Sequence, residues 1–159
     1  MYKEYEYIGN AYTNEWSNLF GCTCGATLKG KINSQTFGVE FPVQCIICAK
    51  EMAVTLGNNL FASVRLPYGC SEWSSLESSN LNAAGIVKDD LIIRFNNGAI
   101  YIYPCVSHLF QPLLKSDSKG KFFCAKIRQL IYSRLCNVYG CMNDKISKKL
   151  KICEKHSSF

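Results

Sequence analysis

The clearest alternation of side chains lies between Leu91 and Tyr103. Residues 91–95 and 99–103 each place successive side chains on two opposite faces of an extended strand. Between them, Asn96-Asn97-Gly98 has the residue types that adopt the positive φ angles of a tight turn. The pattern predicts a β-hairpin, and it predicts a preceding strand over residues 81–87 with a turn at residues 88–90.

Helical patterns follow this hairpin. Ser107 is predicted to cap a short helix over residues 108–115, which Pro112 would shorten or distort. A second helix is predicted to begin after Ser116-Asp117-Ser118 and to pack an apolar face on the hairpin. The residues at helical spacing that carry this prediction are Phe122, Phe123, Ile127, Leu130, Ile131 and Leu135.

Together these elements predict an α+β fold, in which a small antiparallel sheet packs with C-terminal helices and is preceded by a β module. We expect the β module at residues 1–70, and the hairpin and helix module with a basic C-terminal tail at residues 71–159. The Ser-rich segment 71–79 is the expected boundary. Alternation over residues 5–8 predicts an edge strand in the first module.

Composition indicates a folded protein. Of its 159 residues, 48% are hydrophobic and 13% aromatic, which is enough for packed cores. No run of eighteen apolar residues occurs, and the first residues lack the basic-then-apolar pattern of a signal peptide. We therefore expect a cytoplasmic protein, in the host cytoplasm if phage-encoded, that has no membrane partner and whose ten cysteines are thiols or metal ligands.

Four of the cysteines have the spacing of a zinc ribbon. Cys22 and Cys24 form one close pair, Cys45 and Cys48 form another, and residues 25–44 separate them. A tetrahedral zinc ion needs four thiolates from two tight turns, so we expect a turn at each pair, a hairpin between the pairs and a closed, structural zinc site. Buried or redox-active cysteines are the alternative.

A second group of metal-ligating residue types lies near the C-terminus. It consists of Cys136, Cys141, Cys153 and His156, with lysines between the two pairs. Cys and His at these spacings can form a second zinc site. The alternative is that they are unrelated thiols on a helical tail.

The positive charge is concentrated in the C-terminal half. The chain has a formal charge of +6, and residues 118–159 hold ten Lys or Arg against Asp144 and Glu154, a balance of +8. Such a surface predicts a phosphate-bearing partner. A solvated basic face that only aids solubility is the alternative.

Tyr101 and Tyr103 are two residues apart and therefore share one face of their strand. If the helices cover the other face, with Ile100 and Ile102, the tyrosines stand free beside Arg94 and can stack on a base. If the helices cover the tyrosine face, they are core aromatics. The expected ligand-binding residues are Arg94, Tyr101, Tyr103, Lys119, Lys121 and Arg128.

Several short motifs occur in order between residues 78 and 134. They are Ser78-Ser79-Asn80, Arg94-Phe95-x-x-Gly98, Tyr101-Ile102-Tyr103, Ser118-Lys119-Gly120-Lys121-Phe122-Phe123 and Ile127-Arg128. In this order they resemble the KTSC domain, a module found alone in bacterial and phage proteins and at the C-terminus of some lysyl-tRNA synthetases. The sequence departs from the family at Cys124 and Pro112. The resemblance implies RNA binding.

An aromatic residue on the last hairpin strand and an arginine on the following helix are also similar to the phage Thoeris anti-defence sponges. These bind cyclic ADP-ribose-type signals between subunits of an oligomer without cleaving them. The resemblance implies that Tyr101 stacks on adenine, Arg128 holds phosphate and Gln111 adds a polar contact.

The function expected from the sequence is non-enzymatic. No G-x-S-x-G, P-loop or dinucleotide-binding motif occurs, and the chain has only two histidines. We expect a homo-oligomer that captures a small phosphate-bearing signal, a cyclic nucleotide or a cyclic ADP-ribose-type molecule. An RNA- or tRNA-binding module and a protein-interaction module are the alternatives.

Overall fold

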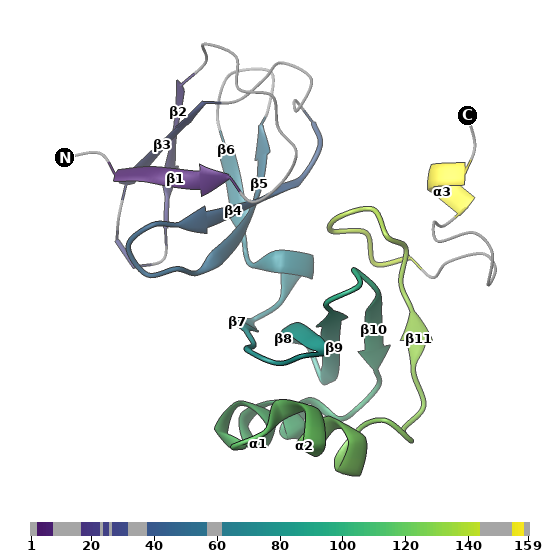
Figure 1. Cartoon of the computed structure of the whole chain (residues 1–159). Coiled ribbons are helices and arrows are strands. Elements are labelled where there is room, and N and C mark those ends of the chain that lie inside the picture. The colour runs from purple at the N-terminus through teal and green to yellow at the C-terminus, as the bar shows by residue number, and fades with distance from the viewer. Residues whose placement is uncertain are drawn as a thin grey trace. The chain divides into compact units, whose positions relative to one another are not determined.

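The computed structural model describes residues 3–7, 17–22, 24–25, 27–31, 38–56, 62–143 and 154–157. It divides the chain into two compact units, Met1–Gly69 and Cys70–Phe159 (Figure 1). Each unit has its own sheet, and short helices accompany the second sheet, so the predicted α+β class is confirmed. No helix in the described ranges is long and apolar enough to cross a membrane.

The Met1–Gly69 unit is built on a six-stranded sheet with the order β2-β3-β1-β4-β5-β6. All neighbouring strands are antiparallel except β1 and β3, which are parallel. A 3-10 helix, η2 (Pro67–Gly69), ends the unit. The strands are β1 (Lys3–Tyr7), β2 (Ser17–Gly21), β3 (Thr27–Lys31), β4 (Phe41–Cys45), β5 (Glu51–Leu56) and β6 (Ala62–Arg65).

This topology corrects two predictions. β1 lies inside the sheet, between β3 and β4, and is not an edge strand. The segment between the two cysteine pairs is not a hairpin either, because β3 and β4 both pair with β1 and not with each other. Each cysteine pair instead lies at the turn of its own hairpin, β2–β3 or β4–β5.

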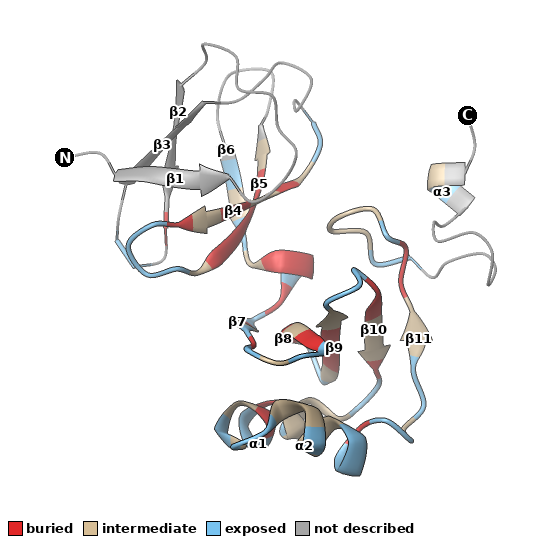
Figure 2. Cartoon of the chain, in the orientation of Figure 1, coloured by how far each residue is buried: buried red, intermediate tan, exposed pale blue. Residues whose placement is uncertain are grey.

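Alternation along β4 gives the first unit its described core. Phe41, Val43 and Cys45 are buried, while the residues between them are half-buried (Figure 2). Met52, Ala53 and Val54 of the neighbouring β5 are also buried. Successive side chains of a strand point to opposite faces, so alternate residues are buried when one face of the strand packs on a core.

The Cys70–Phe159 unit is built on a five-stranded antiparallel sheet with the order β11-β10-β9-β8-β7. The β9–β10 hairpin is confirmed, with Arg94 opposite Ile100 and a positive φ of 87° at Gly98. The Ser-rich segment 71–79 contributes β7 to this sheet. The strands are β7 (Glu72–Ser75), β8 (Leu81–Val87), β9 (Asp90–Phe95), β10 (Ile100–Tyr103) and β11 (Ser133–Arg134).

The helices of this unit are shorter than the sequence predicts. A 3-10 helix, η3 (Ser107–Leu109), leads into α1 (Phe110–Lys115), and Val106 rather than Ser107 precedes it as the cap residue. Pro112 lies in the first turn of α1, where its missing N–H costs no helical hydrogen bond. A further short helix, α3 (Glu154–Ser157), lies near the C-terminus.

α2 (Lys119–Lys126) begins as predicted but ends early. Ser118 is its N-cap and accepts a 3.3 Å hydrogen bond from the backbone N–H of Lys121. The prediction that this helix continues to Leu135 is wrong, because the chain leaves the helix at Ile127 and pairs with β10 at Ser133–Arg134. Arg128 therefore follows the helix instead of lying in its middle.

The core of this unit lies between the sheet and the two helices. Leu91, Ile93 and Tyr103 of the sheet pack against helix-side residues that include Leu113 and Ile127. Tyr103 is 1% exposed, and Tyr101 packs against the same cluster. The helices thus cover the tyrosine face, and the alternative in which both tyrosines stand free is wrong.

Candidate functional site

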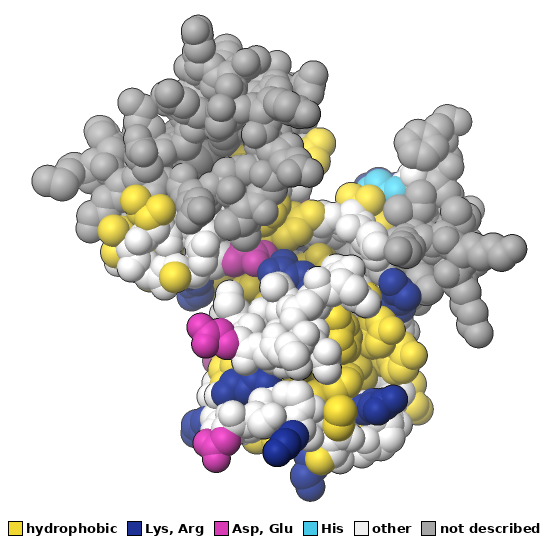
Figure 3. Space-filling model, in the orientation of Figure 1, with side chains coloured by type: hydrophobic (Ala, Val, Ile, Leu, Met, Phe, Trp, Pro, Cys, Tyr) yellow, Lys and Arg dark blue, Asp and Glu magenta, His cyan; other side chains and the backbone are white. Residues whose placement is uncertain are grey.

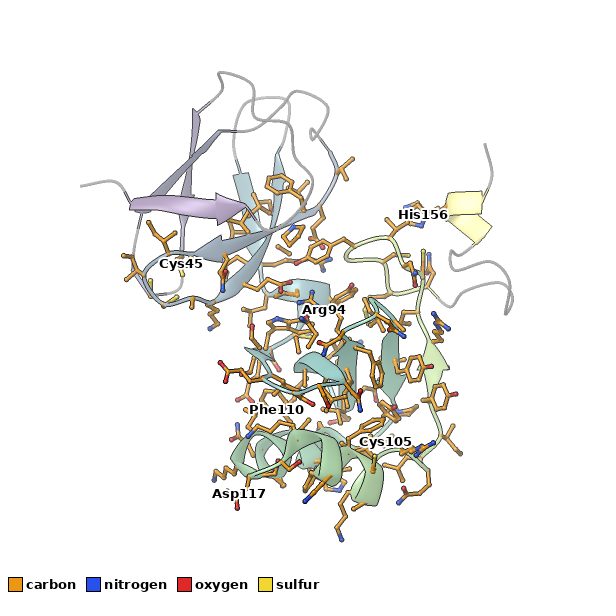
Figure 4. The ribbon with its side chains drawn as sticks, viewed as in Figure 1. Cys45, Arg94, Cys105, Phe110, Asp117 and His156 are labelled. Carbon is orange, nitrogen blue, oxygen red and sulfur yellow. The ribbon has the colours of Figure 1, made fainter. Side chains whose placement is uncertain are left out.

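Two hairpin turns of the Met1–Gly69 unit bring four sulfurs together. Cys22 follows β2, Cys45 ends β4, and all four cysteine sulfurs lie within 4.8 Å of one another. Figure 4 labels Cys45, with other cysteine sulfurs beside it. The backbone N–H of Gly25 donates to the Cys22 carbonyl at 2.9 Å, and Gly25 takes a φ of 88°, so a glycine suits this turn.

The spacing of the sulfurs suits a tetrahedral metal ion. Sγ of Cys22 lies 3.5 Å from Sγ of Cys48, and Sγ of Cys24 lies 3.8 Å from Sγ of Cys45. Four thiolates about 2.3 Å from a central ion in a tetrahedron lie about 3.8 Å apart. Cys22, Cys24, Cys45 and Cys48 therefore have the geometry to bind a metal ion.

The pKa values of two of these thiols, Cys22 and Cys45, are shifted in opposite directions. Burial raises the pKa of Cys22 to about 12. Burial also acts to raise the pKa of Cys45, but hydrogen bonds from the backbone N–H groups of Cys48 and Ile47 and from neighbouring thiols lower it to about 7. Four thiolates this close repel one another, so a bound cation is needed before all of them can be ionised.

The structure also brings together three of the four residues of the second predicted metal site. Cys136, Cys141 and His156 lie within 4.8 Å of one another by their ligand atoms. Cys153, the fourth member predicted from the sequence, lies outside the described residues. The three described residues come from the loop after β11 and from α3.

The described part of the C-terminal unit has two adjoining hollows with Arg128 between them. One, of about 480 Å³, is lined by Asn80, Asn96 and Asn97 together with apolar residues that include Phe95 and Phe123, and we call it the polar hollow only for its three amide side chains. The other, of about 300 Å³, is lined by aromatic rings that include Tyr101 and Tyr132. Arg128, Phe95, Asn97 and Phe123 line both, so we call the two hollows together the Arg128 groove.

Aromatic rings form a continuous row along the groove. Phe123 meets Phe95 at 5.4 Å between ring centroids, and Phe95 meets Tyr101 at 4.9 Å, both edge to face. Tyr132 stacks on Tyr101 with a centroid distance of 4.5 Å and an interplanar angle of 5°. Tyr132 is 47% exposed, so its ring is the accessible end of the row.

Basic side chains adjoin these rings. The Arg134 guanidinium lies 6.0 Å from the Tyr101 ring centroid, within cation–π range. Arg128 is exposed at the groove. In the space-filling view of Figure 3, hydrophobic side chains gather on one face of this unit with Lys and Arg side chains around them.

The structure disperses the other predicted ligand residues. Arg94 lies on the sheet face opposite to Tyr101, where it donates to Asn82 Oδ1 at 2.6 Å and stacks on Trp73 at 5.3 Å. Gln111 donates to Glu72 at 3.4 Å, and the Lys119 ammonium donates to the Ser116 carbonyl. Lys121 is exposed on α2 and is not among the groove residues.

Sequence reasoning missed Tyr132 and the asparagines of the groove. The predicted long helix hid Tyr132, because helical spacing from Phe122 to Leu135 placed it on no apolar face. Asn96 and Asn97 were interpreted only as turn formers, although they are polar side chains at the open end of the hairpin. Their residue types alone could not indicate a site, because Asn is common in such turns for conformational reasons.

Comparison with known families finds a match to part of the chain. The KTSC domain matches residues 77–132, which is 56 of the 159 positions. The match includes β8 to β10, α1, α2 and all the residues that line the Arg128 groove, and it leaves out both cysteine groups. No curated protein matches the chain. These comparisons give no support to the resemblance to Thoeris anti-defence sponges.

Proposed function

We propose that the Cys70–Phe159 unit binds a small phosphate-bearing nucleotide in the Arg128 groove and holds it without converting it. The observation that carries the proposal is the position of Arg128, which lines both the polar hollow and the aromatic hollow. A guanidinium between aromatic rings and amides combines the two parts that a nucleotide requires, a cation for phosphate and a planar surface for a base.

The aromatic row suits the base. Base stacking on an exposed ring contributes about 1–3 kcal/mol and needs no particular base sequence. Tyr132 offers the exposed ring, and the stacked Tyr101 holds it in place. In this proposal Tyr132, rather than the Tyr101 expected from the sequence, stacks on the base, because the Tyr101 ring already has Tyr132 on one face.

The polar hollow suits the sugar and the base edge. Asn96 is oriented by a 3.0 Å hydrogen bond from its Nδ2 to the Ser78 carbonyl. Asn97 is oriented by its Oδ1, which accepts from the Ala99 N–H at 3.0 Å. Amide groups both donate and accept, so they can recognise hydroxyl and base-edge groups.

The size of the groove favours a small ligand over a long one. Hollows of about 300 and 480 Å³ fall within the range of small-molecule sites. Single-stranded RNA or tRNA, which the KTSC resemblance implies, shares the same chemistry and is the alternative. If the ligand is a cyclic nucleotide or a cyclic ADP-ribose-type signal, capture by a homo-oligomer would make the protein an anti-defence sponge, as the sequence predicts.

The residues at the groove support binding without turnover. Among the described lining residues there is no histidine and no carboxylate to act as a general acid or base. Cys124 and Ser79 are the small nucleophilic side chains among them, and both are exposed. We therefore expect a nucleotide recovered from the complex to be chemically unchanged, and chromatography of the released ligand checks this.

The test compares Arg128→Ala with Lys126→Ala by calorimetric titration of cyclic AMP, cyclic ADP-ribose and a single-stranded oligoribonucleotide. Hydrogen bonds to a charged group contribute about 1.5–3 kcal/mol, so Arg128→Ala is expected to weaken binding about 10- to 150-fold. Lys126→Ala removes the same charge from an exposed position outside the groove and is expected to bind normally. Native affinity in a stably folded Arg128→Ala protein would overturn the proposal.

Salt dependence separates the two ligand sources. An oligonucleotide that contacts several phosphates loses affinity steeply as salt rises, whereas a small nucleotide with one or two phosphates shows a shallow dependence. A small nucleotide should also raise the melting temperature of the protein, because it binds the folded state alone. Tight binding of the oligonucleotide with a steep slope would assign the groove to RNA.

We also propose that the metal of the four-cysteine centre is zinc and that its role is structural. Thiolates are the ligands that zinc prefers, and four of them close its coordination sphere, leaving no position for a substrate. The sulfur spacings support this proposal. Its test is the first of the predictions below.

A further inference from the structure

We propose that Cys136, Cys141 and His156 form a second metal site, which takes zinc or a similar thiophilic divalent ion. The site lies outside the KTSC match and shares no residue with the Arg128 groove, so it does not rest on the nucleotide proposal. Its three ligand atoms lie within 4.8 Å of one another, and Cys136 Sγ is 3.4 Å from His156 Nδ1. Figure 4 labels His156 on α3.

The loop after β11 is folded so that both cysteines face one point. The N–H of Leu135 donates to the Ile100 carbonyl at 2.9 Å, which fixes the start of the loop on β10. The N–H of Cys136 donates to the Asn143 carbonyl at 2.8 Å, and that of Cys141 to the Val138 carbonyl at 3.1 Å. The loop therefore closes on itself through backbone bonds, and the two thiols lie within 4.8 Å of each other.

The environment of Cys136 suits a metal thiolate. Cys136 is fully buried, and its sulfur accepts a 3.5 Å hydrogen bond from the backbone N–H of Val138. This hydrogen bond helps to fix the position of the sulfur. A buried thiolate also needs a cation beside it, which a bound metal ion supplies.

The donor set indicates the class of metal. Two sulfurs and one imidazole nitrogen are ligands for zinc and related soft or borderline ions. Calcium and magnesium prefer oxygen ligands, and the cluster has none. Three protein ligands leave one position of a tetrahedron to a group outside this cluster.

Occupancy of this site would have a consequence for the basic tail. Between Cys141 and His156 the sequence holds Lys145, Lys148, Lys149 and Lys151. A metal ion bound by residues on both sides of this segment would fix both of its ends.

The test counts zinc ions on the full-length protein by native mass spectrometry after reconstitution with zinc alone under reducing conditions. We expect Cys141→Ser and His156→Ala each to carry one zinc ion fewer than the unaltered chain. His156→Cys supplies a thiolate in place of the imidazole and should keep the full count. Cys105→Ser, an exposed cysteine outside both clusters, is the matched control and should also keep it.

A second measurement distinguishes the loss of a metal ligand from the loss of the fold. Cobalt reports its sulfur ligands by charge-transfer absorption, so Cys141→Ser, which should leave the second site without its ion, should lose the intensity of both thiolates of that site while its circular dichroism is unchanged. An equal zinc count in Cys141→Ser and the unaltered chain would overturn the proposal. So would a Cys136–Cys141 disulfide that persists under reduction, because it removes both sulfur ligands.

Discussion

The two units bring different kinds of side chain together. In the Met1–Gly69 unit, the sulfurs of two buried and two exposed cysteines from two hairpin turns lie within 4.8 Å of one another. In the Cys70–Phe159 unit, an apolar layer fills the space between the sheet and α1 and α2, with Leu81, Leu91, Ile93 and Leu113 fully buried. From this difference we expect the folding of the first unit to depend on a bound metal ion, whereas the apolar core of the second unit is expected to keep it folded without one.

Metal removal is the strongest way to test this difference. Structural zinc sites contribute apparent binding free energies of about 10–16 kcal/mol, and small metal-dependent units unfold without the ion. We expect a chelator, or Cys45→Ser, to abolish the cooperative unfolding of the first unit while the second unit still unfolds cooperatively. Differential scanning calorimetry of the full chain measures both transitions.

Lowering the pH should remove zinc from the four-cysteine centre progressively, and it therefore tests the same dependence of the first unit on the metal. Zinc binds thiolates, so protons compete with the metal and zinc is released as the pH falls.

The control for metal removal is Cys105→Ser, which alters an exposed cysteine outside both clusters and should leave both unfolding transitions in place. A first unit that keeps its transition in the chelator would show that its apolar residues are sufficient.

Truncation of a core leucine tests the second unit. Leu113 is fully buried on α1 against the sheet, and Leu→Ala at such a position costs about 2–5 kcal/mol through lost burial and the cavity that remains. Leu113→Ala should lower the unfolding free energy of this unit without changing the zinc content of the first. Leu114→Ala, half-buried next to it, should cost less. Equal losses at the two positions would contradict the assignment of the core.

A smaller effect is expected on the other face of the same sheet. Gly85 of β8 pairs with Trp73 of β7, and a Cβ built at Gly85 would approach the Glu72 carbonyl oxygen and the Trp73 ring at 2.7 Å. Overpacking of this kind costs about 1–3 kcal/mol. Gly85→Ala should therefore lower the denaturant midpoint of the second unit. Ala84→Gly, at the neighbouring buried position, separates a packing effect from a general loss of strand stability.

The elements that could be predicted are those whose information is local. Asn96-Asn97-Gly98 specifies its turn within three residues, and the structure has the hairpin with Gly98 at positive φ. Cys22 with Cys24 and Cys45 with Cys48 likewise specify two turns whose sulfurs meet. Ser118 marks the start of α2 because an N-cap is a contact between near neighbours.

The elements that could not be predicted depend on distant partners. Ile131 and Leu135 have helical spacing, but the strand edge of β10 offers hydrogen bonds to Ser133–Arg134 and ends the helical run. Ile131 is consequently 86% exposed instead of lying on an apolar helix face. The period of β10 shows that Tyr101 and Tyr103 share a face, yet only the packing of α1 and α2 decides that this face is covered.

The position of β1 in its sheet has a consequence for the folding of the chain during synthesis. β1 precedes its sheet neighbours in the chain, but it pairs with both β3 and β4, and Tyr5 meets Cys45 across 40 positions of sequence. During synthesis this strand must wait for both partners to leave the ribosome, so closure of the sheet is a late and long-range step. A chain stalled before Phe41 would present β1 with an open edge, the kind of surface from which aggregation begins.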